Sequence, residues 1–255
     1  MFLKLVKHEL HETARILPPV FGGLLLFAAM ARTMIWAMEQ SDNFVMDFMG
    51  SMFIGLFILA CIACVILTAV LLMVRFAKSV HGDEGYLTHT LPVGVHSILL
   101  SRLLITVLSL AVALGVVCLG IFLCTWNVDA LSELGEALDF LGLDTALLWQ
   151  ALASVFVQLI TTVLLIFAAI SIGHSFNRGK AGFSILFYFA LNTTASVLST
   201  LAALLLTENL FVAEPAEIDS FTNSSFLISL CLNLIFCGVY YFISWIMTKK
   251  RLNLS

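Results

Sequence analysis

Long apolar runs separated by short polar segments form the main pattern of this chain. Six blocks are rich in Leu, Ile, Val, Phe and Ala, at residues 16–38, 46–74, 98–128, 146–172, 181–205 and 225–247. A helix of about 20 residues crosses the hydrocarbon core of a bilayer, and every block reaches that length. The first block contains Arg32, and the other five have charge-free cores. The pattern predicts an all-α, polytopic membrane protein with six transmembrane helices, in which residues 1–255 form a single transmembrane domain.

The first 15 residues have a different, amphipathic pattern. At helical spacing, one stripe is apolar and the opposite face carries Lys4, His8, His11 and Arg15. The apolar stripe consists of Phe2, Leu3, Val6, Leu10, Ala14 and Leu17. A helix of this kind lies in the head-group region of a bilayer. We therefore expect a surface helix over residues 1–15, which Pro18-Pro19 breaks before the chain enters the membrane.

Composition agrees with this interpretation, and the distribution of charge adds an orientation. Apolar residues make up 61% of the chain and charged residues 11%, against about 25% charged residues in a soluble domain. Eleven of the twelve basic residues fall at the N-terminus, in alternate loops and in the C-terminal tail, whereas twelve of the sixteen acidic residues fall in the opposite loops. The positive-inside rule then places both termini in the cytoplasm of a multi-pass protein of the cell membrane. A basic inner face suits anionic lipids, and its scattered cations do not suggest nucleic acid.

Three short motifs resemble enzyme or cofactor sites but lack the required spacing. His8-Glu9-Leu10-His11 is one residue shorter than the zinc-protease motif. Cys61-Ile62-Ala63-Cys64 lies inside an apolar block without further soft ligands, so we expect packing residues there. The stretch from Gly173 to Ala181 has one residue too many for a phosphate loop and joins two membrane spans, where we expect a turn. The sequence thus predicts no enzyme, no metal and no cofactor on this chain.

Polar residues recur at helical spacing in the last two blocks. Asn192, Ser196 and Ser199 share one face of the fifth block, and Ser225, Ser229, Asn233 and Cys237 share one face of the sixth. Such stripes either pack between helices or line a translocation path, and packing is the commoner role. We expect Arg32 near the outer edge of the bilayer core, where its side chain can extend to the interface and meet Glu39 or Asp42; the alternative is a place on a substrate path.

The most distinctive polar segment is the island at residues 75–97, between the second and third blocks. Asp83 and Glu84 suit the first turn of a short helix, from which Tyr86 and Leu87 would project, and Pro92 would end it. An ordinary amphipathic loop on the lipid surface is one interpretation. The other is a knob that fits a groove on a cytoplasmic partner, with the Tyr-Leu pair as its anchor.

These residues resemble the permease subunits of ABC-2 type transporters, closest to the type found in Gram-positive bacteria. The resemblance covers the six-span layout, but only the 75–102 motif is specific. It rests on Arg75-Phe76, Gly82-Asp83-Glu84-Gly85-Tyr86-Leu87, Thr90-Leu91-Pro92-Val93 and Ser101-Arg102, with Leu5–Leu10, Arg15 and Lys249–Leu254 as weaker matches. Some family members have re-entrant outer helices between spans five and six; Thr207–Ser224 is short and acidic here, so we do not expect them.

The resemblance implies a subunit that forms the translocation path of an exporter and pairs with a second copy or a related permease. ATP and magnesium would bind a separate ATP-binding subunit, seated on a coupling helix in the 75–97 loop. The residues carried over to this contact are Asp83, Glu84, Tyr86, Leu87, Thr90, Leu91 and Pro92, and the N-terminal helix would be a second contact. A hypothesis from another class remains open, in which the chain is a non-transporting adaptor or sensor subunit docked on a transporter or kinase.

Overall fold

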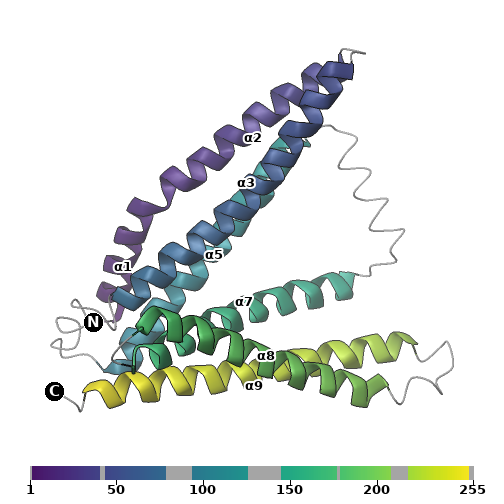
Figure 1. The fold of residues 1–255 in the computed structure, drawn as a ribbon. Coiled ribbons are helices and arrows are strands. Elements are labelled where there is room, and N and C mark those ends of the chain that lie inside the picture. Colours follow the sequence, from purple (N-terminus) through teal and green to yellow (C-terminus); the bar gives the residue numbers. More distant parts are fainter. Residues whose placement is uncertain are drawn as a thin grey trace. The chain divides into compact units, whose positions relative to one another are not determined.

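The computed structural model describes residues 2–40, 44–78, 94–125, 145–176, 179–207 and 218–252. Within these ranges, side chains are described except those of residues 2–5, 39, 145–148, 180, 206–207, 218–225 and 250–252. The described residues form seven α-helices and no strand. The helices are α1 (Phe2–Ile16), α2 (Pro18–Glu39), α3 (Phe44–Phe76), α5 (Val95–Cys124), α7 (Thr145–Gly173), α8 (Lys180–Thr207) and α9 (Ile218–Leu252) (Figure 1).

Six of these helices are long and apolar enough to cross a membrane, which confirms the predicted all-α, multi-pass class. They correspond one to one with the six apolar blocks, with ends that differ by a few residues. The α3 helix continues to Phe76, and α5 begins at Val95 and ends at Cys124. The coupling helix predicted in the 75–97 loop falls at residues 79–93, outside the described residues, as does the acidic loop at residues 129–144.

The amphipathic N-terminal segment is helical, and the two prolines separate it from α2. Pro18 and Pro19 occupy the first positions of α2, where their missing N–H groups cost least. Leu17 keeps a right-handed helical conformation, and its carbonyl accepts the N–H groups of Val20 and Phe21 at 3.0 and 3.1 Å. The prolines therefore interrupt the hydrogen bonds of the helix, and α2 continues from α1 after a bend (Figure 1).

The chain divides into two compact units. Unit 1 comprises residues 1–74 and 104–143, and unit 2 comprises residues 75–103 and 144–255. The division crosses α3 after Val74 and α5 after Leu103, so each of these helices contributes to both units. In unit 1, buried side chains of α2, α3 and α5 form one core, made of Leu24, Ala28, Ala31, Phe57, Cys61, Cys64 and Cys124.

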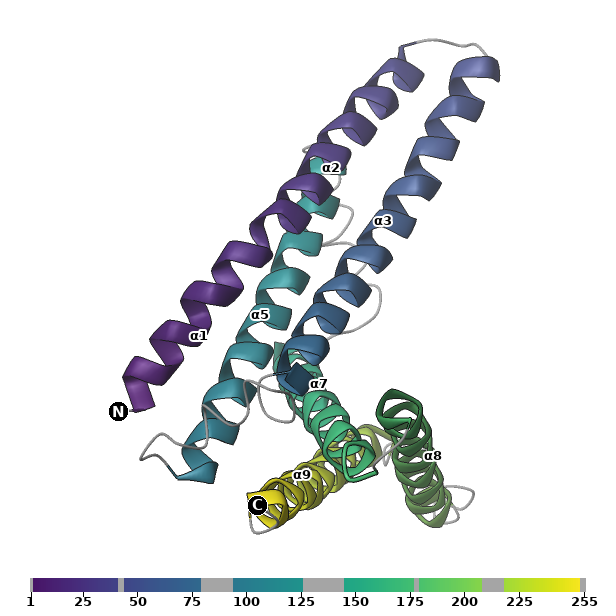
Figure 2. The ribbon, with the colours of Figure 1, turned by 60° about the vertical axis from the view of Figure 1, so that its left-hand side comes forward.

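Unit 2 is built around α7, which packs against both α8 and α9 (Figures 1 and 2). Its core joins Leu164, Leu165 and Ala168 of α7 to Tyr240 of α9. Small residues such as Ala168, which is fully buried, let neighbouring helices approach closely in a membrane bundle. Leu103 of α5 packs on the same core, so the first part of α5 belongs to this unit.

Gly173 and Gly179 lie at the two ends of the connection from α7 to α8, of which residues 174–176 and 179 are described. Gly173 ends α7, and a Cβ added there would collide with the Oγ, N and Cα atoms of Ser184. Gly179 directly precedes α8 with a φ of +70°, a conformation that other residues adopt at a cost. Both glycines are thus required by the backbone of this connection.

Candidate functional site

The segment predicted to dock a partner, residues 79–93, lies outside the described residues. It contains all seven predicted coupling residues, Asp83, Glu84, Tyr86, Leu87, Thr90, Leu91 and Pro92. The structure does describe the residues on both sides of this segment, and both belong to unit 2. The candidate site is therefore defined by how unit 2 holds the two ends of the segment.

The first end is held by a buried aromatic stack, the Phe anchor. Phe76, the last residue of α3, stacks on Phe167 of α7 with ring centroids 3.7 Å apart and planes 5° from parallel. The two side chains are 2% and 1% exposed. One turn of π-helix at Ala77 and Lys78 follows, and the described part of this end stops there. Because both rings are buried, the end of α3 is fixed to α7 by close packing.

The second end is held by an exposed group of polar and aromatic side chains, the interface cluster, formed by His96, Tyr241, Trp245 and Lys249. His96 lies in the first turn of α5, and its Nδ1 atom is 3.0 Å from the hydroxyl oxygen of Tyr241 on α9. The imidazole also stacks on the indole of Trp245, with centroids 4.9 Å apart. The ammonium of Lys249 lies 5.1 Å from the centre of the same indole, within cation–π range.

Polar side chains are buried beside these ends. Ser101 and Arg102 in the early part of α5 are 0% and 6% exposed, and Ser244 and Thr248 of α9 are 0% and 4% exposed. The Thr248 hydroxyl donates to the Ser244 carbonyl at 2.7 Å. This bond, like the 2.9 Å bond from the Ser101 hydroxyl to the Ile98 carbonyl, lies within one helix, so it satisfies a buried hydroxyl without joining two helices.

The predicted polar stripe of α9 is divided between packing and exposure. Asn233 and Cys237 are half-buried, and Cys237 packs against the core of unit 2. The Thr161 hydroxyl of α7 is 3.3 Å from the backbone carbonyl oxygen of Asn233. The side-chain Nδ2 of Asn233 donates to the backbone carbonyl of Ser229 at 3.0 Å. Ser229 is exposed, and the side chain of Ser225 is outside the described set. The C-terminal half of this stripe, Asn233 and Cys237, therefore lies at the contact with α7.

The predicted stripe of α8 has the same spacing and a different environment. Asn192, Ser196 and Ser199 are all exposed. Ser196 does take part in a bond within its own helix, since its carbonyl accepts the Thr200 hydroxyl at 2.8 Å. Between described residues, no hydrogen bond joins this stripe to that of α9. Whether it lines a path stays a prediction.

Arg32 has a partner at the end of α5. Its Nη1 atom donates to the carbonyl of Cys124 at 3.3 Å, and the Cys124 thiol donates to the Ala28 carbonyl at 3.4 Å. Cys124 is the last residue of α5, where carbonyls lack partners within the helix and a cation is favourable. The side chains of Glu39 and Asp42, the partners expected from the sequence, lie outside the described residues.

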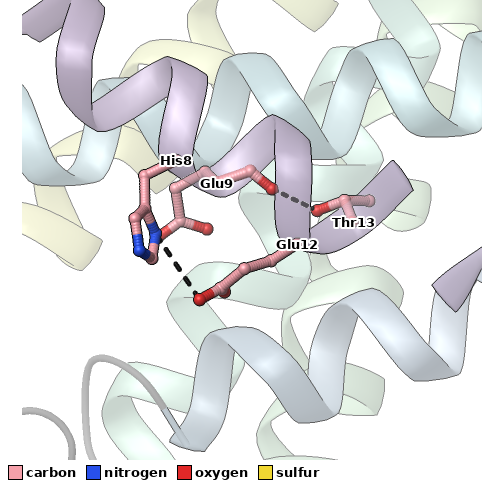
Figure 3. A network of polar contacts seen from close by, with 4 residues as sticks. All are labelled: His8, Glu9, Glu12 and Thr13. Carbon is pink, nitrogen blue, oxygen red and sulfur yellow. Dashed lines mark hydrogen bonds and ion pairs between the residues drawn. The ribbon is translucent and has the colours of Figure 1, made fainter. Parts of the chain in front are cut away.

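The polar face of α1 carries a small network of contacts (Figure 3). His8 Nδ1 lies 3.5 Å from a carboxylate oxygen of Glu12, and these side chains are 75% and 52% exposed, so the pair contributes little stability. The Thr13 hydroxyl donates to the Glu9 carbonyl at 2.8 Å (Figure 3). Thr13 is buried although the apolar stripe predicted from the sequence excludes it, whereas Leu10 of that stripe is 42% exposed.

Three of the four cysteines of unit 1 are buried, and the fourth, Cys118, is exposed. Cys61 and Cys64 are buried in the core with Cys124, as expected for packing. Across the described part of the chain, no group of three or more His, Cys, Asp or Glu side chains is arranged to hold a metal ion.

Sequence reasoning missed the Phe anchor and the interface cluster. The signals available were a Phe at the end of an apolar block and Tyr241, Trp245 and Lys249 at spacings of four residues. Tyr and Trp gather at membrane–water interfaces, which favours such a cluster, but the partner His96 is 145 residues from Tyr241.

Comparison of the chain with family models, with curated proteins and with solved structures gives no match.

Proposed function

We propose that this chain is the membrane-spanning permease subunit of an ATP-binding-cassette exporter. A separate ATP-binding subunit, which holds ATP and magnesium, would dock on residues 79–93 from the cytoplasm, and a second permease chain would complete the transporter. The ABC-2 resemblance of residues 75–102 suggests this role. Six apolar helices supply the membrane domain that it requires.

The observation that carries the proposal is that both ends of the docking segment belong to one packed unit. Phe76 is stacked on α7, and His96 is bonded to α9. A close-packed interior transmits strain because it has little room to deform. A force on residues 79–93 would therefore act on α7 through Phe76 and on α9 through His96.

The proposal separates residues that dock from residues that transmit. Tyr86→Ala with Leu87→Ala should abolish binding of the ATP-binding subunit. Phe76→Ala should leave that subunit bound and weaken the response of the membrane helices. The first measurement is purification of the tagged full chain from its native membrane in mild detergent, with mass spectrometry of the co-eluting proteins.

The second measurement follows the membrane helices. In a variant whose native cysteines are replaced, Ser196→Cys and Ser229→Cys report accessibility to a thiol reagent with and without ATP. Leu201→Cys is the matched control, because Leu201 is 52% exposed on the opposite side of α8 from the polar stripe. We expect ATP to change the labelling at the two serine positions and to leave position 201 unchanged.

Two outcomes would reject the exporter. A preparation that contains no ATP-binding subunit, or a different stable partner, would support the adaptor or sensor hypothesis. Labelling that is insensitive to ATP while the ATP-binding subunit is bound would have the same consequence.

A further inference from the structure

One face of α9 is an exposed apolar stripe that leads to a lysine. Ile235, Val239 and Phe242 are 61%, 47% and 55% exposed and follow one another at intervals of four and three residues. Lys249 lies two turns beyond Phe242 on the same face, because residues seven apart nearly superimpose along a helix. Since α9 is long and apolar enough to cross a bilayer, this face suits lipid acyl chains.

The polar stripe of α9 lies on another side of the helix. Cys237 packs against the core of unit 2, and the backbone carbonyl of Asn233 is 3.3 Å from the Thr161 hydroxyl of α7. The apolar stripe is therefore the side of α9 that unit 2 leaves open.

At its end, the stripe meets the interface cluster. The ammonium of Lys249 and the imidazole of His96 lie 5.1 and 4.9 Å from the centre of the Trp245 indole. Phe242 also contacts that indole, with centroids 5.8 Å apart. The apolar stripe and the two nitrogen-bearing groups are thus joined through one aromatic ring, an arrangement suited to the boundary between acyl chains and head groups.

The cluster presents hydrogen-bond donors to an anion. Lys249 is exposed and supplies three N–H donors, and among the described residues it forms no ion pair. His96 Nδ1 and the Tyr241 hydroxyl oxygen lie 3.0 Å apart, and either group can donate to the other. In the tautomer in which the hydroxyl donates, Nε2 of His96 carries a proton and is a second donor. The described side chains of unit 2 also include the basic residues Arg75 and Lys78.

We propose that the interface cluster binds the phosphate of an anionic phospholipid, whose acyl chains lie along Ile235, Val239 and Phe242. Lys249 and His96 donate to the phosphate oxygens, and Trp245 fixes both groups in place. The apolar stripe selects a lipid over a soluble phosphate compound, because only a lipid can cover it.

The test uses the fluorescence of Trp245 in the full-length protein. Trp36→Phe, Trp126→Phe and Trp149→Phe leave Trp245 as the sole tryptophan. The protein is purified in a neutral detergent and titrated with dioctanoyl phosphatidylglycerol, with dioctanoyl phosphatidylcholine and with inorganic phosphate. We expect a saturable change in emission with phosphatidylglycerol at lower concentrations than with phosphatidylcholine, and no saturable change with inorganic phosphate.

Substitutions divide the site into its charged and apolar parts. Lys249→Gln should weaken phosphatidylglycerol binding about fivefold, the effect of one cation near an anionic head group. Lys78→Gln is the charge-matched control and should change the affinity less than about twofold, since it removes the same charge from the same unit outside the cluster. Val239→Asn, which leaves every cation in place, should also weaken binding because it puts an amide on the acyl-chain track.

Retention of phosphatidylglycerol in native mass spectrometry provides a readout that does not depend on Trp245. Saturation by inorganic phosphate would overturn the lipid assignment, and so would an unaltered affinity in Val239→Asn. Equal losses in Lys249→Gln and Lys78→Gln would reduce the effect to general charge attraction and also overturn it.

Discussion

The two ends of the 79–93 segment are held in contrasting ways. The Phe anchor is dry, with two stacked rings that are almost completely buried between α3 and α7. The interface cluster is open, with His96 and Lys249 exposed on either side of a half-buried Trp245. Both ends use aromatic contacts. Packing holds the Phe anchor, whereas hydrogen bonding and charge hold the interface cluster.

This difference separates two tasks. A buried stack responds steeply to a change of shape and little to the solvent, so the Phe anchor suits the transfer of displacement. The interface cluster is exposed and contains the charged Lys249, so its interactions depend on salt, lipids and ligands. Through this cluster, the surroundings can change the stability of unit 2. We expect substitutions at the two ends to differ in size and in their dependence on lipid.

The largest effect is expected at the Phe anchor. Phe76→Ala leaves a cavity beside Phe167 and should reduce stability by about 3 kcal/mol, the lower end of the range for buried Phe→Ala changes. The lower end applies because lipid offers no hydrophobic drive between helices. Thermal unfolding of the purified chain in detergent measures the change. Phe76→Leu, which retains much of the volume, should lose less than half as much, and equal losses would show that the stack does not hold α3.

The Phe anchor depends on the position of α7, which ends in the close contact of Gly173 with Ser184 on α8. A substitution at Gly173 tests how much this contact stabilises the unit. Gly173→Ala would place a methyl group against the Ser184 backbone, whose N and Cα atoms lie 2.5 and 2.6 Å from the new Cβ. Overpacking of this kind costs about 1–3 kcal/mol. Gly182→Ala is the control, because no atom lies within 4 Å of its added Cβ and alanine favours the helix. Thermal unfolding of both variants should show a loss only at position 173.

A smaller effect is expected at the interface cluster. Tyr241→Phe removes the hydrogen bond to His96 and should reduce stability by about 1 kcal/mol. A double-mutant cycle with His96→Ala isolates the pair, because His96→Ala alone also removes the stacking on Trp245. If the two substitutions were additive, the hydrogen bond would contribute nothing, and the second end would be held by stacking alone.

The smallest effect concerns the contact that joins α7 to α9 and so links the two ends. Thr161→Val removes the 3.3 Å contact with the Asn233 carbonyl together with the 2.9 Å bond to the Val157 carbonyl of its own helix. The contact between helices should contribute about 0.6 kcal/mol, the average for such bonds in membranes. Thr162→Val is the matched control, since the exposed Thr162 hydroxyl bonds only to Gln158 of its own helix. A calibrated thermal-unfolding series should distinguish the two, and equal effects would mean that the contact with α9 contributes no stability.

The sequence predicted the helices well because apolar length alone decides whether a helix can cross a bilayer. It placed the helix ends less accurately, as at Phe76 and Val95, because hydropathy reports surroundings and a helix ends where its hydrogen bonds end. The identical spacing of the two polar stripes shows a further limit. Asn233 contacts α7 and Asn192 is exposed, and only the positions of the neighbouring helices decide which environment each stripe meets.

The Phe anchor and the interface cluster could not be predicted from the sequence, for a related reason. Phe76 and Phe167, like His96 and Trp245, become neighbours only when distant helices pack, and a single sequence carries no signal that pairs them. The coupling residues at positions 83–92 were proposed from a family resemblance and stay a prediction. The structure adds where the ends of their segment are held.

A crosslink between the Phe76 and Phe167 positions tests whether the end of α3 is fixed to α7 in the membrane. Phe76→Cys and Phe167→Cys are introduced together into the chain with its native cysteines replaced, and native membranes are treated with a short thiol-specific crosslinker. If Phe76 and Phe167 are neighbours in the membrane, the two cysteines should form an efficient crosslink within one chain, and the crosslink should be lost when either cysteine is absent. If both single cysteines react with a thiol reagent in the unfolded chain but the pair does not crosslink in the membrane, the anchor does not exist as described.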